Sequence, residues 1–334
     1  LQSQQWVNEK QDKNFSYLAY FDIDDNRFHR LAGDSIRRYV AAKRGDFSIG
    51  FNRDKYYLQY SLEGRNFRDI YVYDLNTGTN HLALEKNRWY FGNSPDNKYF
   101  LYYTDGHFYT YDMEKKKRIN ITEKMPVSFI DVEDDHNVKN PPVPPRGWSE
   151  DSQYVLLSDG WDIWKVRRDG RKFTNLTQDG KTKNIRYGRD YRLYPEDEGI
   201  DLDKDLYLRI YGEYTKKNGI GKISRGKPGV EKLFFSDHNY RDLKKAEDAD
   251  IFVYTKEDFD SFHDYYATDE KFTNSKKITN VNPQQADYLW SSGRRIIDYV
   301  TEYGDSLQGV LYLPANYEKG KTYPTIVYMY EKLS

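Results

Sequence analysis

One short run of the sequence has the residue types that nucleophilic catalysis uses. Gly304-Asp305-Ser306-Leu307 spells the opening of a nucleophile block, in which a serine stands between a buried strand and a helix. Here the serine is flanked by two strand-like runs, 299–303 and 308–312, so we interpret Ser306 as the tip of a hairpin. The chain contains no G-x-S-x-G sequence, and no nucleophile, base or orienting acid of a serine triad can be assigned within it.

Other clusters of ligand-type side chains lack the spacing that their chemistry requires. Asp201-Leu202-Asp203-Lys204-Asp205 begins like a calcium loop, but its sixth position is not glycine and its twelfth is Gly212 rather than glutamate. Tyr194-Pro195-Glu196-Asp197-Glu198 is an acidic cluster that we interpret as a solvated turn. The chain has no cysteine, and its six histidines show no close pairs, so we expect neither a metal nor a cofactor.

The composition indicates a folded chain with an aromatic core. Its 334 residues are 37% hydrophobic and include 33 Tyr, 17 Phe and 6 Trp, whereas disordered chains are poor in aromatic residues. The formal net charge is −1, from 52 Lys and Arg against 53 Asp and Glu, so we expect no nucleic-acid partner. The longest apolar run, Ile326–Tyr330, is far shorter than the ~18 residues that a membrane span needs.

Short alternating runs between turn-forming clusters indicate strands through most of the chain. Helical periodicity is confined to the first dozen residues and to Tyr240–Ala249. A polar turn that carries aspartate and leads into an aromatic strand recurs at Asn52–Tyr57, Ser94–Tyr99 and Trp148–Tyr154. A second type of strand follows each of these phrases, at Asp69–Asp74, His107–Asp112 and Trp161–Val166.

A period of about 40–50 residues with four strands is typical of a propeller blade. We count six or seven such units and predict an all-β propeller over residues 1–290, with seven blades favoured and eight as the alternative. The spacing lengthens before Trp148 because of an acidic stretch that ends in Pro141-Pro142-Val143-Pro144-Pro145. Proline cannot donate to a strand ladder, so we predict an inter-blade insertion at 131–147.

The pattern changes after Ser291-Ser292-Gly293. Arg295–Tyr303 and Leu307–Pro314 predict a hairpin, and Thr325–Tyr330 is the most apolar strand of the chain. A strand that is apolar on both faces is typical of a sheet covered on both sides, as in α/β proteins. We therefore predict that residues 291–334 are the first strands of a truncated α/β-hydrolase domain.

Three segments carry a resemblance to a known family. Ile278–Trp290, Tyr303–Pro314 and Tyr323–Tyr330 resemble the propeller-to-hydrolase junction of the prolyl oligopeptidase family of serine peptidases, with dipeptidyl-peptidase-IV-like bacterial members as the best match. Trp148–Asp151, Trp161–Trp164 and Asn175–Thr177 are similar to one blade of those enzymes. The resemblance covers most of the chain and is vague before about residue 45.

The resemblance implies a function for the intact protein. The propeller would gate access of oligopeptides to a hydrolase domain of the same chain, which would hold the triad outside this sequence, and this chain alone would be inactive. Tyr330 matches the tyrosine whose hydroxyl stabilises the oxyanion, although Glu331 and Lys332 replace the small residues usual after it. The aromatic-then-double-glutamate phrase of dipeptidyl peptidases is absent, so release of dipeptides and endo- or oligopeptidase action both stay open.

Peptides and the hydrolase domain in cis are therefore the expected partners. By analogy with similar bacterial proteins we favour a periplasmic or extracellular location, and the analogy extends to a homodimer of the parent. The alternative is a stand-alone propeller that serves as a binding scaffold, TolB-like or WD-repeat-like, without catalysis. Trp161 and Trp164 would then be candidates for contact with a partner.

Overall fold

The computed structural model describes residues 2–41, 44–59 and 66–329, which consist mainly of β-strands and turns. The helical segments in these residues are short and include α1 (Gln2–Lys13), α3 (Gly180–Lys183) and the 3-10 turns η1 (Asp54–Tyr56) and η2 (Pro283–Asp287). The all-β prediction is confirmed, and α1 agrees with the helix expected in the first dozen residues. Among the described residues, no helix has the length and apolarity that crossing a bilayer requires.

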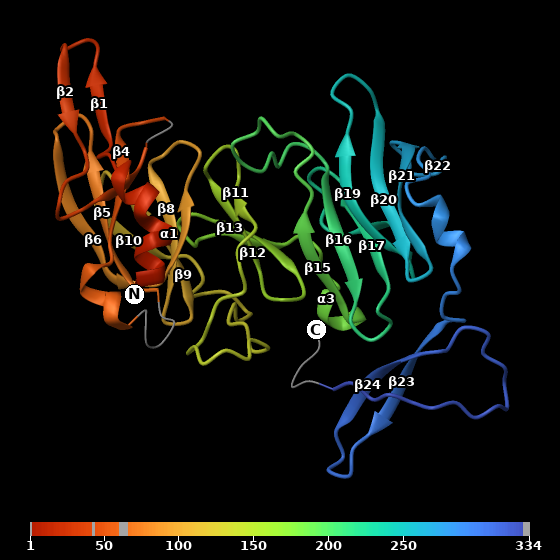
Figure 1. The fold of residues 1–334 in the computed structure, drawn as a ribbon. Coiled ribbons are helices and arrows are strands. Elements are labelled where there is room, and N and C mark those ends of the chain that lie inside the picture. The colour runs from red at the N-terminus through yellow and green to blue at the C-terminus, as the bar shows by residue number, and fades with distance from the viewer. Residues whose placement is uncertain (1, 42–43, 60–65, 330–334) are drawn as a thin grey trace. The chain divides into compact units, whose positions relative to one another are not determined.

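The chain divides into two compact units, one ending at Asp237 and the other beginning at His238. Over the described residues, the first unit has a hairpin and four antiparallel sheets, each with its four strands in chain order (Figure 1). The strands are β1 (Ala19–Asp22) and β2 (Arg27–Arg30) in the hairpin; β3 (Arg38–Val40), β4 (Phe47–Asn52), β5 (Arg68–Asp74) and β6 (Thr79–Asn87) in the first sheet; β7 (Trp89–Asn93), β8 (Tyr99–Thr104), β9 (His107–Asp112) and β10 (Lys117–Asn120) in the second; β11 (Gly147–Trp148), β12 (Tyr154–Ser158), β13 (Ile163–Arg167) and β14 (Phe173–Asn175) in the third; and β15 (Ile185–Asp190), β16 (Leu206–Gly212), β17 (Asn218–Ile223) and β18 (Glu231–Ser236) in the fourth.

The second unit has one more four-stranded sheet and one hairpin in its described residues. Its strands are β19 (Asn239–Lys245), β20 (Ile251–Asp258), β21 (Ser261–Asp269) and β22 (Lys276–Lys277) in the sheet, and β23 (Arg294–Val300) and β24 (Ser306–Tyr312) in the hairpin. The described part of the chain thus has five four-stranded sheets, and neither seven nor eight blades is confirmed. The domain boundary after residue 290 also stays a prediction, because compactness alone does not identify a hydrolase domain.

Three predicted elements differ from the structure. The polar turn at Asn52–Tyr57 leads into η1 and not into the aromatic strand that we expected. The helix expected at Tyr240–Ala249 is wrong: β19 occupies its first part, and a bulge between Arg241 and Lys244 lets Tyr240 and Leu243 both be buried. This bulge produces a three-residue spacing that imitates a helical face. The strand expected at Thr325–Tyr330 is not formed over the described residues 325–329, which pair with no other strand there, and a strand needs such a partner to satisfy its backbone.

The recurring polar phrase forms the same turn in two successive sheets. The Ser94 hydroxyl donates to Asp96 Oδ1 at 2.5 Å and accepts from the Tyr99 amide at 3.0 Å. The Ser149 hydroxyl donates to Asp151 Oδ1 at 2.6 Å and accepts from the Tyr154 amide at 2.9 Å. Each turn joins the first strand of its sheet to the second, so these two members of the sequence repeat are also a structural repeat.

Neighbouring sheets of the first unit pack through aromatic faces. Side chains of β8 alternate between two clusters: Phe100 and Tyr102 pack with residues of the first sheet, whereas Leu101 and Tyr103 pack with residues of the third. Phe100 also stacks on Tyr111 with ring centroids 4.8 Å apart. The expected aromatic core is therefore present, and it holds successive sheets face to face.

The predicted insertion at 131–147 is an irregular connection that follows the second sheet. It extends to Arg146, because Gly147 already belongs to β11. Its first residue is joined to its proline-rich part by a hydrogen bond from the Asp131 amide to the Pro141 carbonyl at 2.7 Å. Glu133 pairs with Arg186 of β15, so the insertion is tied to the fourth sheet.

Candidate functional site

A cleft of about 410 Å³ lies in the first unit, where the third and fourth sheets meet. One wall is the segment that leads into and forms β11, and the other is the connection between β15 and β16, residues 191–205. Antiparallel neighbours are usually joined by two to five residues, so this connection is an insertion. It supplies most of the polar side chains of the cleft.

Backbone hydrogen bonds fix the inserted connection against the third sheet. The Ile200 amide donates to the Trp148 carbonyl at 2.8 Å, and the Glu150 amide donates to the Ile200 carbonyl at 3.0 Å. Ser149 and Ile200 form a parallel bridge. A side chain at Gly199 would place its Cβ 2.6 Å from the Cα of Glu150, so only glycine permits this approach.

Replacing Gly199 by alanine is therefore expected to destabilise the first unit by roughly 1–3 kcal/mol, because the backbone of the third sheet must shift to make room. Thermal unfolding followed by circular dichroism measures the effect. Gly33→Ala is the matched control, since a Cβ at Gly33 meets only Arg30 at 3.9 Å. Equal melting temperatures for the two variants would contradict the proposed close approach.

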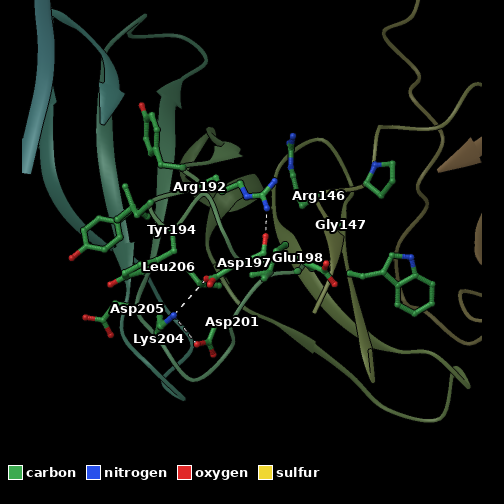
Figure 2. Close-up of a pocket in the computed structure, with 17 residues that line it drawn as sticks. Arg146, Gly147, Arg192, Tyr194, Asp197, Glu198, Asp201, Lys204, Asp205 and Leu206 are labelled. Carbon is green, nitrogen blue, oxygen red and sulfur yellow. Dashed lines mark hydrogen bonds and ion pairs between the residues drawn. The ribbon is translucent and has the colours of Figure 1, made fainter. Parts of the chain in front are cut away.

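Lys204 organises the charges of the cleft. Its ammonium lies 3.2 Å from Asp201 Oδ2 and 3.5 Å from Asp197 Oδ2, and 4.1 Å from the centre of the Tyr194 ring. Figure 2 shows Lys204 between the two carboxylates, and Arg192 donating to the Asp197 backbone carbonyl. The polar groups of this wall are thus held in fixed positions by one another.

These contacts keep both members of the Lys204–Asp201 pair ionised. Burial raises the pKa of Asp201, but the hydrogen bond from the Asp203 amide and the Lys204 ammonium outweigh it and hold that pKa below its ordinary value. The hydrogen bond to Asp201 and the charge of Asp197 raise the pKa of Lys204, although burial opposes them. The cleft therefore presents charges of both signs at neutral pH.

The lining of the cleft is suited to binding a polar ligand. None of its lining residues is serine, threonine, cysteine or histidine, so a serine-type or cysteine-type catalytic pair with a histidine base is not present in it. It combines aromatic rings with positive and negative groups, a mixture that fits a polar chain such as a peptide. The aromatic and basic members are Trp148, Tyr191, Tyr194, Tyr207, Arg146, Arg192 and Lys204, and the acidic members are Asp197, Glu198, Asp201 and Asp205.

The acidic turn at 194–198 is largely exposed, as we expected of a solvated turn, but it also contacts other parts of the first unit. Asp197 and Glu198 also line a second cavity of about 430 Å³, together with Asp96 and Glu150 from turns of the second and third sheets. Arg44 approaches this cavity with its Nε 3.5 Å from Glu198 Oε2. The turn reaches this place because the pairing at Ile200 folds the whole connection back onto the third sheet.

The structure separates the other residues singled out from the sequence. Trp164 is buried in the core and donates from Nε1 to Asp159 at 2.9 Å, while Trp161 lies under the Arg186 guanidinium at 4.3 Å. Ser306 begins β24 directly after the turn 301–305, which confirms the hairpin interpretation. Tyr330 lies outside the described residues.

The insertion carries one exposed group with metal-type ligands, Asp134, Asp135 and His136. His136 Nδ1 lies 3.1 Å from Asp134 and 3.6 Å from Asp135, so the histidine pairs with its neighbours. Exposed groups of this kind are common without an ion, and we assign no metal role to them.

Sequence reasoning missed the cleft because its residues are distant in the chain. Arg146 directly precedes β11, Trp148 belongs to β11, and Arg192 and Lys204 come from the connection that precedes β16. The signal that was available is length: a 15-residue stretch of turn-forming residues between two strands, 191–205, where a short hairpin loop would suffice.

No protein-family model and no curated protein matches this sequence. Solved structures that are similar to it include an acylaminoacyl peptidase from Pyrococcus horikoshii, at 14% identity and a TM-score of 0.36 over 91% of this chain. They also include the dipeptidyl peptidase 4 of Porphyromonas gingivalis, at 9% identity and a TM-score of 0.43 over 93% of this chain. A third is an oligogalacturonate lyase in complex with manganese, at 12% identity and a TM-score of 0.40 over 84% of this chain. This chain spans 56%, 64% and 74% of their lengths, respectively.

Proposed function

We propose that this chain is the propeller region, together with the first hydrolase strands, of a serine peptidase that hydrolyses peptide bonds in oligopeptides. The propeller corresponds to residues 1–290 and the beginning of the hydrolase domain to 291–334. The nucleophile, base and orienting acid belong to the remainder of the parent, and Tyr330 supplies an oxyanion donor. The sequence resemblance at 278–330 is the origin of this proposal.

The exposed apolar residues of the second unit are the observation that carries the proposal. Residues 325–329 are the most apolar run of the chain, yet Ile326 is 96% exposed and Met329 is 78% exposed. The hairpin β23–β24 likewise exposes Ile297, Val300 and Tyr312. Soluble proteins rarely leave such a run uncovered, and a parallel hydrolase sheet would bury it on both faces.

The repeated sheets and the cleft support the role given to the propeller. Successive four-stranded antiparallel sheets, each built from one stretch of chain, are the expected blade architecture. The cleft near Lys204 offers aromatic rings and charges of both signs but no serine, threonine or cysteine, which suits a surface that holds a peptide. In the proposal the propeller admits oligopeptides and excludes folded proteins.

The test uses the product of the complete gene beside the 334-residue chain. A fluorophosphonate probe, which labels activated serines, is expected to label the complete product, and that product is expected to hydrolyse short peptides but not folded proteins. The 334-residue chain is the matched control and is expected to show neither labelling nor hydrolysis.

Two outcomes would contradict the proposal. Labelling of the 334-residue chain itself would place a reactive serine where the sequence provides no nucleophile motif. A complete product that is neither labelled nor able to hydrolyse peptides would favour the binding-scaffold alternative instead.

A further inference from the structure

A further pocket, separate from the two cavities described above, lies between the third and fourth sheets and is distinguished by its charge. It has a volume of about 220 Å³, and its lining includes five basic side chains and no acidic one. We call it the lysine pocket and define it by Lys165, Lys172, Lys204, Arg225 and Lys227. It lies wholly within the first unit.

Three of the five cations have no carboxylate partner among the described residues. Lys204 is paired with Asp197 and Asp201, and Arg225 is paired with Asp203 at 3.2 Å. Lys165, Lys172 and Lys227 take part in no ion pair within the part of the chain that the structure describes. Lys165 instead lies 5.0 Å from the centre of the Tyr154 ring.

The floor of the pocket is apolar and its walls are fixed. Leu176, Leu202, Leu206 and Ile223 contribute to the lining, and the hydroxyl side chains of Thr174 and Ser224 stand beside them. Lys165 and Thr174 are direct neighbours across β13 and β14, so the lysine and the hydroxyl lie on one face of the third sheet.

The facing wall is a hydrogen-bonded turn that is tied to the third sheet. The Lys227 amide donates to the Ser224 carbonyl at 3.0 Å, and Gly226 has the positive φ of 67° that a turn of this kind requires. The Gly229 amide then donates to the Leu176 carbonyl at 2.7 Å. Lys227 is therefore presented to the pocket by a constrained segment that bridges the two sheets.

We propose that the lysine pocket binds a compact anion, a phosphate or carboxylate head group carried on a small apolar body. Unpaired lysines around a hollow lower the free energy of an anion placed between them, and the two hydroxyls can donate to its oxygens. The apolar floor covers the body of the ligand. The volume is below the ~300–1,000 Å³ of drug-sized ligand sites, which selects for a small molecule.

Isothermal titration of the 334-residue chain tests the proposal, with phenyl phosphate, benzoate and phenol as probes. Phenyl phosphate is expected to bind, more weakly at high salt than at low salt, and phenol is expected to bind far more weakly because it lacks the charge. Binding of benzoate would extend the site to carboxylates, and its failure would restrict the site to phosphates.

The variants K172Q and K227Q, combined, are expected to weaken phenyl phosphate binding roughly tenfold, since each removes one exposed charge. Replacing the same two lysines by arginine keeps the charge and is expected to keep the binding. The control combines K124Q and K139Q, which change exposed lysines outside this pocket and are expected to have no effect.

Circular dichroism checks that each variant remains folded. Three results would overturn the proposal: no heat with either anion, equal binding by the wild type and the K172Q/K227Q variant, or binding of phenol as tight as that of phenyl phosphate.

Discussion

Replacing Asp69 by alanine is expected to lower the free energy of unfolding by about 3 kcal/mol, because it removes a fully buried carboxylate that accepts two hydrogen bonds and forms an ion pair. The Asp69 side chain is 0% exposed. Its Oδ1 accepts from the Tyr56 hydroxyl at 2.6 Å and from the Lys86 amide at 3.0 Å, and its Oδ2 lies 3.0 Å from the Lys55 ammonium. Alanine leaves the hydroxyl and the amide without their acceptor inside the first sheet.

The same carboxylate makes stability depend on pH. Burial raises the pKa of Asp69, but the hydrogen bonds from Tyr56 and the Lys86 amide, with the charge of Lys55, outweigh it and hold the folded-state pKa below the ordinary value. A lowered folded-state pKa means that the stabilisation is complete above the unfolded-state pKa of about 4 and is lost as pH falls through the folded-state pKa. Denaturant unfolding is therefore expected to show a smaller loss of stability below pH 4 in Asp69→Ala than in the wild type.

Glu85 provides the matched control for Asp69. It also approaches Lys55, at 3.4 Å, but its side chain is 65% exposed, so Glu85→Ala is expected to change stability by less than about 1 kcal/mol. Asp69→Asn keeps the shape and one acceptor but not the charge, and is expected to reduce the loss of stability below pH 4 at a smaller cost. Equal unfolding midpoints for Asp69→Ala and Glu85→Ala would show that the buried network does not stabilise the sheet.

The features that could be predicted best from the sequence are turns whose hydrogen bonds form within a few consecutive residues. The turns at Ser94 and Ser149 were recognisable because each uses a serine and an aspartate within one short phrase to satisfy its own backbone. The hairpin around residues 301–305 was recognisable for a similar reason, since a turn cluster stands between two strand-like runs.

Features that depend on irregular pairing or on distant residues were hidden. The bulge in β19 shifted Tyr240 and Leu243 into a helical spacing, and no local signal distinguishes that pattern from a helix. The contacts of the acidic turn at 194–198 could not be read from the sequence, because they depend on the pairing of Ile200 with Ser149. The lysine pocket is a similar case, because Lys165 and Lys227 meet only through the packing of two sheets.

The apolar run at 325–329 shows that an apolar sequence pattern alone does not determine a strand. Its composition predicts a buried strand, but a strand forms only where neighbouring strands accept its backbone hydrogen bonds. The described residues provide no such neighbour for this run, and its side chains remain exposed. The predicted burial of this run must therefore be tested in the intact protein, as must the role proposed for Tyr330, the next residue.

In the complete peptidase that we propose, replacing Tyr330 by phenylalanine is expected to lower kcat about 100-fold or more while KM changes little. The proposed hydroxyl would donate to the oxyanion only as negative charge develops, so its loss raises the barrier without weakening substrate binding. Steady-state kinetics on a short peptide substrate, with circular dichroism to confirm folding, measures the effect. The expected split between kcat and KM separates an oxyanion donor from a residue that only packs.

Tyr328 is the matched control for this experiment, because it is a tyrosine of the same apolar run two positions earlier. Tyr328→Phe removes the same atom two residues earlier, on the same face of the predicted strand, and is expected to leave kcat within about a factor of two of the wild type. An unchanged kcat in Tyr330→Phe would remove Tyr330 from the mechanism. A fall in kcat of equal size in both variants would assign the effect to packing of the strand.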